Sequence, residues 1–342
     1  MIDEYLIRSV KYGVRRLSHA IIVIWGVTLV TFVVARLLPG NPVYLMVGNQ
    51  ADESTVQAAM AKLGFDKPIP EQYAIYMQGL LRGDLGRAWT TSHPVTEDIR
   101  QRFPATLELS VVAFLLALLL ALPLGIAAGL RPSSAVHRLA QLVSTFGVAL
   151  PQFWLGLMLI YVFFFRLRLM PPPMGRLPLV AAPHPITGLM LIDTLLAGNT
   201  DHFLLAAKVL VLPAVTLALA IQAPILNLIQ VSMAAAMNSD AVRTARALGL
   251  PRREVIVQHA LRIAVLPVLN MIAITFGYLL SGTVLVESVF SWPGIGLYAL
   301  QAMNASDYAA IQGVVLFSAM IYVAVYIALD IAQFVIDPRI RV

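Results

Sequence analysis

Between Lys208 and Asp240 the chain has a charge-free run, Val209–Ser239, with the sequence VLVLPAVTLALAIQAPILNLIQVSMAAAMNS. Directly after this run comes a charged segment, Asp240-Ala-Val-Arg-Thr-Ala-Arg-Ala-Leu-Gly249. A helix needs about 20 apolar residues to cross the hydrocarbon core of a bilayer, so the run is long enough to span it. The charged segment must then lie outside the membrane. Long apolar runs separated by polar segments decide the fold class of this chain.

The composition of the whole chain agrees with this interpretation. Of its 342 residues 59% are hydrophobic and 12% are charged, and the mean hydropathy is +0.81. Soluble domains carry about 25% charged residues, so the composition indicates an integral membrane protein. Only helices and closed barrels span bilayers, and long continuous apolar runs favour helices. We therefore predict an all-α integral membrane protein with six transmembrane helices.

The apolar runs predict where each span begins and ends. The predicted spans are residues 17–38, 105–130, 139–165, 208–237, 263–287 and 308–336. The predicted segments outside the membrane are 1–16, 39–104, 166–207, 238–262, 288–307 and 337–342. The further apolar run Leu177–Ile192 contains three prolines, which break helices, so we predict a loop there.

The longest hydrophilic segment, 39–104, is predicted to be a small helical insertion. Asp52 can cap a helix that runs from about Glu53 to Leu63. A second helix is predicted to start at Pro70 and to end near residue 82.

The distribution of Lys and Arg predicts the orientation of the chain in the membrane. Thirteen of the 24 Lys and Arg residues lie in segments that are cytoplasmic if the N-terminus is inside. The short loop 291–306, on the opposite side, has none. Positive charge in short loops marks the cytoplasmic side, so we expect both termini and Asp240–Gly249 to be cytoplasmic and the insertion to be periplasmic. This rule explains the sequence pI of 9.7 better than binding of nucleic acid does.

The segment Asp240–Gly249 is predicted to be a short helix, capped by Ser239 or Asn238 and ended by Gly249. On a helical wheel one face carries Ala241, Thr244, Ala245 and Leu248, and the other carries Val242, Arg243 and Arg246. A basic loop lying among lipid headgroups is one explanation of this pattern. However, lipid interfaces favour bulky apolar residues over small ones. We therefore expect a protein partner on the Ala241/Ala245 face, with the arginines reaching around its edge.

Several catalytic signatures are absent from the sequence. The four lysines follow Val10, Ala61, Asp66 and Ala207, so there is no G-x-x-x-x-G-K-[ST] phosphate loop. There is also no H-E-x-x-H, no G-x-S-x-G and no cysteine. We expect a chain that is not itself an enzyme and that binds no metal or cofactor.

Polar residues inside or beside the spans leave alternatives open. Gln222, Asn227 and Gln230 can face an aqueous translocation path, or they can hydrogen-bond between helices and to carbonyls freed by a proline. Glu108, Glu287 and Asp330 stand at span ends, where headgroups and water can solvate them. We expect Glu287 to hold the turn at Trp292-Pro-Gly. A mid-span carboxylate is lacking, which argues against an ion-coupled carrier.

Asp240–Gly249, followed by Leu266-Pro267, resembles the coupling loop (EAA motif) of ATP-binding-cassette importer permeases. Ala245 and Gly249 are in place, whereas Asp240 stands near the position where many relatives carry Glu. Other motifs resemble the B-type permease subunit of dipeptide, oligopeptide and nickel importers, and they run nearly from end to end. They are Leu38-Pro-Gly-Asn-Pro42, Leu63-Gly-Phe-Asp-Lys-Pro-Ile-Pro-Glu-Gln-Tyr73, Gly83-Asp-Leu-Gly86, Glu287-Ser-Val-Phe-Ser-Trp-Pro-Gly-Ile-Gly296, Asp307-Tyr308 and Asp337-Pro-Arg-Ile-Arg341.

The resemblance implies a type I importer in a bacterial inner membrane, with residues 95–336 as its permease domain. It implies a second homologous permease subunit, two ATPase subunits that bind ATP and Mg, and an extracytoplasmic solute-binding protein. By carry-over, the residues that contact the ATPase are Asp240, Arg243, Thr244, Ala245, Arg246, Ala247, Leu248 and Gly249.

Within this family a dipeptide or oligopeptide is the expected substrate, and nickel or another small solute is the alternative. Two other classes compete with the importer hypothesis. An ion-coupled secondary carrier would be expected to show repeats and midplane binding residues, which are not evident. An intramembrane enzyme is disfavoured by the missing catalytic signatures.

Overall fold

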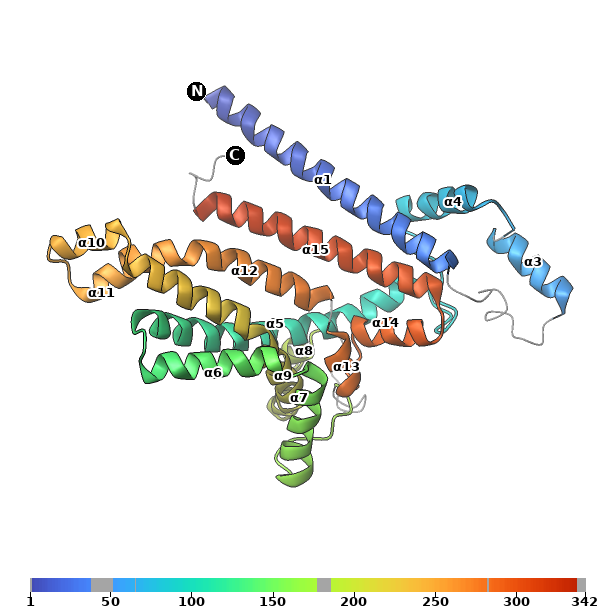
Figure 1. Ribbon diagram of the computed structural model, residues 1–342. Helices are drawn as coiled ribbons and strands as arrows, with labels where there is room; N and C mark the ends of the chain where they lie inside the picture. The colour runs from blue at the N-terminus through green and yellow to red at the C-terminus, as the bar shows by residue number, and fades with distance from the viewer. Residues whose placement is uncertain (1, 38–51, 65, 177–185, 282, 337–342) are drawn as a thin grey trace. The chain divides into compact units, whose positions relative to one another are not determined.

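The computed structural model describes residues 2–37, 52–64, 66–176, 186–281 and 283–336. Over these residues the chain is helical, with one isolated β-bridge between Arg87 and Pro94. It divides into two compact units (Figure 1). The first comprises Met1–Phe103 and Leu297–Ile327, and the second comprises Pro104–Gly296 and Ala328–Val342. The prediction of an all-α membrane protein is confirmed.

The first unit joins the N-terminal helix to the predicted insertion. Its helices are α1 (Ile2–Leu37), α3 (Glu53–Leu63), α4 (Ile69–Leu81), the first turns of α5 (Val95–Leu130), and most of α14 (Ile295–Asn304) and α15 (Tyr308–Ile336). Phe32 of α1 is buried, and its ring lies 5.2 Å from Tyr73 and 5.7 Å from Tyr76 of α4, centroid to centroid. These rings attach α4 to α1.

Both predicted helices of the insertion are present. α3 has the predicted bounds, and α4 begins one residue before Pro70. Asp52 is the N-cap residue of α3, as predicted, and its carboxylate accepts hydrogen bonds from the hydroxyls of Ser54 and Thr55. Two hydroxyls close in sequence compete with the backbone for the same oxygens.

The Asp307-Tyr308 motif caps α15. Asp307 is buried, and its carboxylate accepts from the backbone N–H of Ala310 at 3.2 Å. The same carboxylate accepts from the N–H and the hydroxyl of Thr90, at 3.0 and 2.8 Å. The Gly83-Asp-Leu-Gly86 turn packs nearby, where a Cβ on Gly86 would lie 3.4 Å from that of Ala309. Both motifs therefore hold the start of α15.

The second unit is built around α9. Its helices are the rest of α5, α6 (Ala135–Ala149), α7 (Gln152–Leu159), the π-helix η1 (Ile160–Arg166), α8 (Met190–Leu196), α9 (Thr200–Met237), α10 (Asp240–Ala247), α11 (Arg252–Glu254), the π-helix η2 (Val255–Ala260), α12 (Leu261–Ser281) and α13 (Val284–Val289). In the apolar 18-residue stretch that qualifies α9 as a membrane span, half of the residues are buried within the chain. The corresponding share is 17–33% in the other straight candidate spans. α9 is therefore the central helix.

Two glycines bring α5 against α9. A Cβ on Gly125 would lie 2.9 Å from the carbonyl oxygen of Leu226, and one on Gly129 would lie 2.6 Å from that of Gln230. Their spacing of four residues puts both on one face of α5, so the two helix backbones approach closely. Small residues at this spacing are a common means of packing helices within a membrane.

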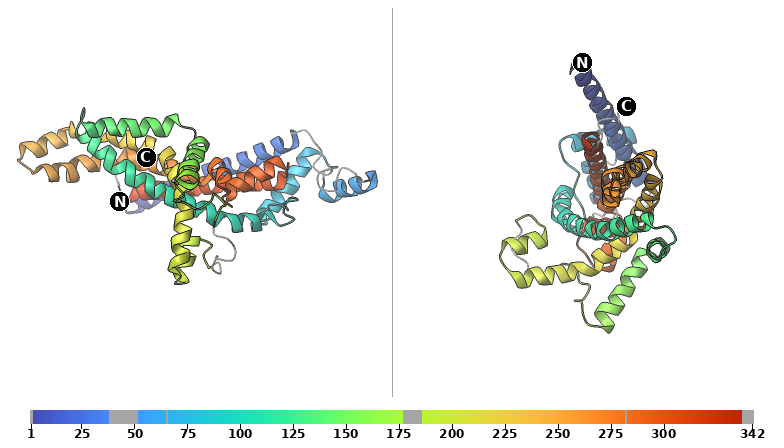
Figure 2. Two further views of the ribbon diagram at one scale, coloured as in Figure 1. Left: turned by 90° about the horizontal axis from the view of Figure 1, so that it is seen from below. Right: turned by 90° about the vertical axis from the view of Figure 1, so that its left-hand side faces the viewer.

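The third predicted span, 139–165, is not a single straight helix. The direction of the helix changes by 105° between α6 and the segment α7–η1. Figure 2 shows the two parts running in different directions. The break falls at Leu150 and Pro151, where Leu150 is extended with φ −92° and ψ 125°. Proline lacks a backbone N–H and drives the preceding residue out of the helical region. The structure thus has five helices long and apolar enough to span, or six if the bent pair is one span, among its described residues.

Several helix bounds differ from the predictions. α5 and α9 begin at Val95 and Thr200, earlier than the predicted spans, because their first turns are polar and hydropathy does not detect them. The fifth helical stretch starts at Arg252 and ends at Ser281, before the predicted end of the span. The short helices α8, α13 and α14 were not predicted. Parts of the predicted loops, 38–51 and 177–185, and the tail 337–342 lie outside the described residues.

Candidate functional site

The segment that was predicted to meet a partner lies at one end of the second unit. α10 and α11 project beyond the ends of α9 and α12 (Figure 1). Ser239 begins α10, and its hydroxyl accepts from the N–H of Val242. Gly249 ends the helix with φ +76°. Its N–H bonds to the carbonyl of Arg246, and the N–H of Leu250 bonds to that of Ala245, which is a Schellman motif. The predicted helix and its two caps are confirmed.

One side of α10 packs against its own chain and is closed to a partner. Val242 and Ala245 are buried in the core cluster that includes Met233 and Val255. Ala241, by contrast, is exposed. Val242 is the larger side chain, and burying it turns α10 so that Ala245 shares its buried side. The expectation of a partner on the Ala241/Ala245 face is corrected for Ala245, which together with Val242 anchors α10 to its own chain, whereas Ala241 stays accessible.

The outward side of α10 carries charge and one large apolar residue. Asp240, Arg243, Thr244, Arg246, Ala247, Leu248 and Gly249 are exposed. The Leu248 side chain is 74% exposed. An Arg243 nitrogen lies 3.6 Å from an Asp240 carboxylate oxygen, with both side chains in solvent. Such a pair contributes little to stability. The chain thus presents a rigid, capped helix whose outer surface has no packing role of its own.

The three polar residues of α9 lie in different environments. Gln222 is fully buried, and its Nε2 donates to the carbonyl of Val143 on α6 at 3.0 Å. The Nε2 of Gln230 lies 3.4 Å from Nδ1 of His137, also on α6. Asn227 is exposed. For Gln222 and Gln230 the contacts match the alternative of hydrogen bonding between helices, and Asn227 alone of the three faces outward.

Glu287 is enclosed by the turn that follows it. Its carboxylate is fully buried and accepts from the hydroxyl of Thr106 at 2.7 Å. The same Thr106 oxygen accepts from the N–H of Ile295 at 2.8 Å, and Trp292 Nε1 donates to the carbonyl of Ala105 at 2.9 Å. A Cβ on Gly294 would lie 2.4 Å from the carboxylate. The predicted role in holding the turn is confirmed, whereas solvation by water is wrong because protein donors surround the group.

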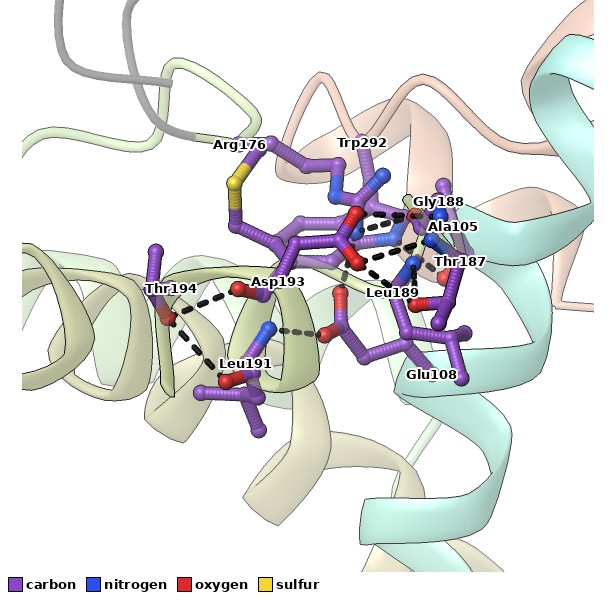
Figure 3. Close-up of polar contacts among 11 residues, drawn as sticks. Ala105, Glu108, Arg176, Thr187, Gly188, Leu189, Leu191, Asp193, Thr194 and Trp292 are labelled. Atoms are coloured by element: carbon purple, nitrogen blue, oxygen red, sulfur yellow. Dashed lines mark hydrogen bonds and ion pairs between the residues drawn. The ribbon is translucent and has the colours of Figure 1, made fainter. Parts of the chain in front are cut away.

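Glu108 is also enclosed by protein. Only 4% of its side chain is exposed, and Arg176 Nη2 lies 2.5 Å from one carboxylate oxygen. The other oxygen accepts from the N–H of Leu191 at 2.6 Å. Arg176 also donates to the carbonyl of Gly188 at 3.0 Å, and its guanidinium lies 6.0 Å from the ring centroid of Trp292. Figure 3 shows this cluster, which ties α5, the loop before α8 and the Trp292 turn together.

Asp193 completes the cluster from α8 (Figure 3). Its carboxylate accepts from the N–H and hydroxyl of Thr187, at 2.8 and 2.7 Å, and from the N–H of Gly188 at 3.0 Å. Burial raises the pKa of this carboxyl, but the hydrogen bonds from Thr187 and Gly188 outweigh burial and hold the pKa below its ordinary value. We call the residues Glu108, Arg176, Asp193 and Trp292 the loop latch.

Sequence reasoning missed the loop latch. Arg176 and Asp193 lie in a segment that hydropathy marks only as a loop, and the partner Glu108 is 68 positions away from Arg176. The one local signal was the spacing of Thr187-Gly188 and Asp193. A hydroxyl residue and a glycine precede a short helix, and an acidic residue follows six positions after the hydroxyl. Arg176 and Asp193 of the latch precede α9 in the chain, whereas α10 follows it.

No group of three or more His, Asp or Glu within the described part of the chain is placed to hold a metal ion. Comparison with protein families gives two matches. The family described as "Binding-protein-dependent transport system inner membrane component" matches residues 121–342. The family described as "Binding-prot-dependent transport system membrane comp, N-term" matches residues 9–110.

Similar proteins match over nearly their whole length. The di/tripeptide transport system permease protein of Pseudomonas aeruginosa is 41% identical, over 96% of this chain and 97% of its own. The dipeptide transport system permease protein of Escherichia coli K12 is 38% identical, over 97% and 98%. The glutathione transport system permease protein of Escherichia coli O6:H1 is 30% identical, over 97% and 99%.

Proposed function

Because the chain belongs to the family of binding-protein-dependent transport system inner membrane components, we propose that it forms half of the pore of an ATP-driven peptide importer. Family membership makes the chain an inner membrane permease subunit of an ABC transport system. Peptide as the substrate class is supported by the relatives whose names state dipeptide or di/tripeptide transport. Nickel or another small solute is the second candidate, because the motifs that identify the family resemble those of peptide and nickel importers alike.

The proposed contact with the ATPase is the outward side of α10. The observation that carries this proposal is a short helix, capped at both ends, that lies between two spans and buries only Val242 and Ala245. The residues proposed to contact the partner are Asp240, Arg243, Thr244, Arg246, Ala247, Leu248 and Gly249. Leu248 offers an apolar contact, and the two arginines can bind carboxylates or carbonyls on the ATPase. Ala245 acts from the inner side, as an anchor.

The anchoring of α10 explains how force can reach the spans. Val242 and Ala245 belong to the same core cluster as Ile229 of α9 and Ala264 of α12. A displacement of α10 therefore moves both helices. In the proposed cycle, ATP and Mg bind to the two partner ATPase subunits and draw them together. The α10 helices of the two permease subunits then approach each other, the pore opens outward, and hydrolysis restores the inward-open state.

The other partners follow from the orientation that we propose. α10 and both termini face the cytoplasm, and α3 and α4 lie outside, where a solute-binding protein delivers the substrate. The second permease subunit covers apolar faces that the chain leaves open. In the membrane-spanning part of α1, for example, only 17% of the residues in the apolar stretch are buried within the chain. Asn227, which is exposed on α9, is the residue proposed to line the translocation path, and Gln222 and Gln230 support it by holding α6.

The test uses the purified transporter in proteoliposomes with ATP inside. Arg246→Glu and Gly249→Val are expected to lower peptide uptake and co-purification of the ATPase, while the chain still inserts into the membrane. Arg138→Glu, at an exposed position on α6, is the control for reversed charge. Gly249→Asn is the control for the positive φ, because Asn tolerates this conformation. Uptake at the wild-type level in both test variants would refute the coupling role. ATP-independent uptake by the chain alone would favour a secondary carrier.

A further inference from the structure

A groove lined by both arginines and apolar residues lies next to η2, the π-helix that packs against α10. It opens where the end of α5 and the start of α6 meet α11 and η2, and its volume is about 620 Å³. Three arginines line it, Arg131, Arg252 and Arg253, together with the apolar residues Ala127, Leu130, Val136, Ile256 and Val257. All of these residues belong to the second unit. The groove thus joins concentrated positive charge to an apolar wall.

The three arginines come from two separate chain segments and converge on one opening. Arg131 follows α5, whereas Arg252 and Arg253 begin the helical stretch that leads into α12. All three are exposed, and within the described residues none forms an ion pair with a carboxylate. Glu254, the acidic residue next to them, does not line the groove. Guanidinium groups stay charged at every physiological pH, so the groove attracts an anion.

The position of the groove along the spans selects the kind of anion. Leu130 is the last residue of one candidate span, and Arg252 is the first residue of another. Arg131, which directly follows Leu130, therefore stands at the level of the lipid headgroups, and Arg252 and Arg253, from the predicted cytoplasmic segment 238–262, line the same groove beside it. Ala127 lies further into α5, on the bilayer side of Arg131, and Val257 follows Arg252 and Arg253 in the direction of the predicted span 263–287. A phosphate among the arginines would leave acyl chains against Val257, whose side chain is 51% exposed.

We propose that this groove binds an anionic phospholipid, with the headgroup phosphate among Arg131, Arg252 and Arg253 and an acyl chain along Val257. Basic pockets between membrane helices on the cytoplasmic side bind such headgroups. Assignment to the cytoplasmic leaflet rests on the proposed function, whereas lipid binding itself does not. η2, which carries Val257, also packs against α10. Bound lipid therefore connects the α5–α6 turn to the support of α10 and stiffens that support.

The test measures lipid binding to the full chain in detergent by native mass spectrometry and by thermal stabilisation. Phosphatidylglycerol, phosphatidylcholine and inorganic phosphate are the three ligands added. The test variant is Arg131→Gln/Arg252→Gln/Arg253→Gln. A control of equal charge is Arg138→Gln/Arg166→Gln/Arg168→Gln, at exposed positions that do not line the groove. Val257→Asn changes the apolar wall and leaves the charge intact.

Wild type and control are expected to bind phosphatidylglycerol in preference to phosphatidylcholine. Each arginine contributes about a fivefold change in affinity, so the triple variant loses on the order of a hundredfold. Val257→Asn weakens binding of the lipid and leaves weak binding of phosphate unaltered.

Three results would overturn the proposal. One is equal loss of lipid binding in the test and control variants, which would indicate general charge attraction. Another is equal protection by inorganic phosphate with no effect of Val257→Asn, which would indicate a phosphate site. The third is unchanged lipid binding together with lost ATPase co-purification, which would make the groove a protein contact. A melting temperature of the lipid-free triple variant equal to that of wild type shows that a change in binding is not caused by misfolding.

Discussion

Removal of the arginine from the loop latch should destabilise this chain more than removal of both charged partners. In Arg176→Met the Glu108 carboxylate keeps its bond from Leu191 but loses its cation, with only 4% of its side chain exposed to water. Breaking one partner of a buried ion pair costs about 3–5 kcal/mol. Loss of the hydrogen bond to the Gly188 carbonyl adds about 1 kcal/mol. We expect a loss of roughly 5 kcal/mol in the free energy of unfolding.

The double variant Glu108→Gln/Arg176→Met isolates the electrostatic part of this loss. A neutral amide can still accept from Leu191, so the double variant should recover about 2 kcal/mol or more relative to Arg176→Met. Equilibrium unfolding in mixed micelles of dodecyl maltoside and SDS measures these differences, and hydrogen exchange at Leu191 reports the latch locally. Arg166→Met, at an exposed arginine, is the control. A single variant within about 1 kcal/mol of wild type, or a double variant less stable than the single one, would refute the reasoning.

Three further predictions concern contacts that hold the second unit. Gly129→Leu should separate α5 from α9 and lower the unfolding free energy by at least about 1–3 kcal/mol, whereas Gly26→Leu, with no atom within 4 Å of its Cβ position, should change it little. Comparison of their thermal melting tests this, and equal melting of the two variants would contradict the close approach. Thr106→Val should cost about 1–3 kcal/mol by removing a donor from buried Glu287, and Thr106→Ser should restore most of it. Chemical unfolding of the pair decides, and a Ser variant as unstable as the Val variant would argue against the hydroxyl. The folded-state pKa of Asp193 is lowered, so its stabilisation is complete above the unfolded pKa and is lost as the pH falls through the folded pKa. Asp193→Asn should therefore flatten the acid side of the stability profile measured by melting against pH, and an unchanged slope would show that another group titrates there.

The features that could be predicted from sequence are those that depend on neighbouring residues. Long charge-free runs specify membrane helices, because water is not available inside the bilayer to satisfy a backbone that is not helical. α15 has the predicted bounds, and α10 begins and ends as Ser239 and Gly249 indicate. Caps are local hydrogen bonds within a few residues, so a short stretch of sequence contains all the partners. The motifs that identified the family are also short stretches of sequence, so they could be recognised without the fold.

Tertiary structure decided the features that depend on distant residues. Thr106 meets Glu287 across 181 positions and Glu108 meets Arg176 across 68, and hydropathy at a span end carries no signal of either partner. The inward side of α10 was likewise decided by packing. Ala245 lies inside because Val242 is buried against η2 and α9, and a helical wheel shows only which residues share a face, without showing which face the rest of the chain covers. Burial of a face requires a surface to bury it against, and that surface exists only once the chain has folded.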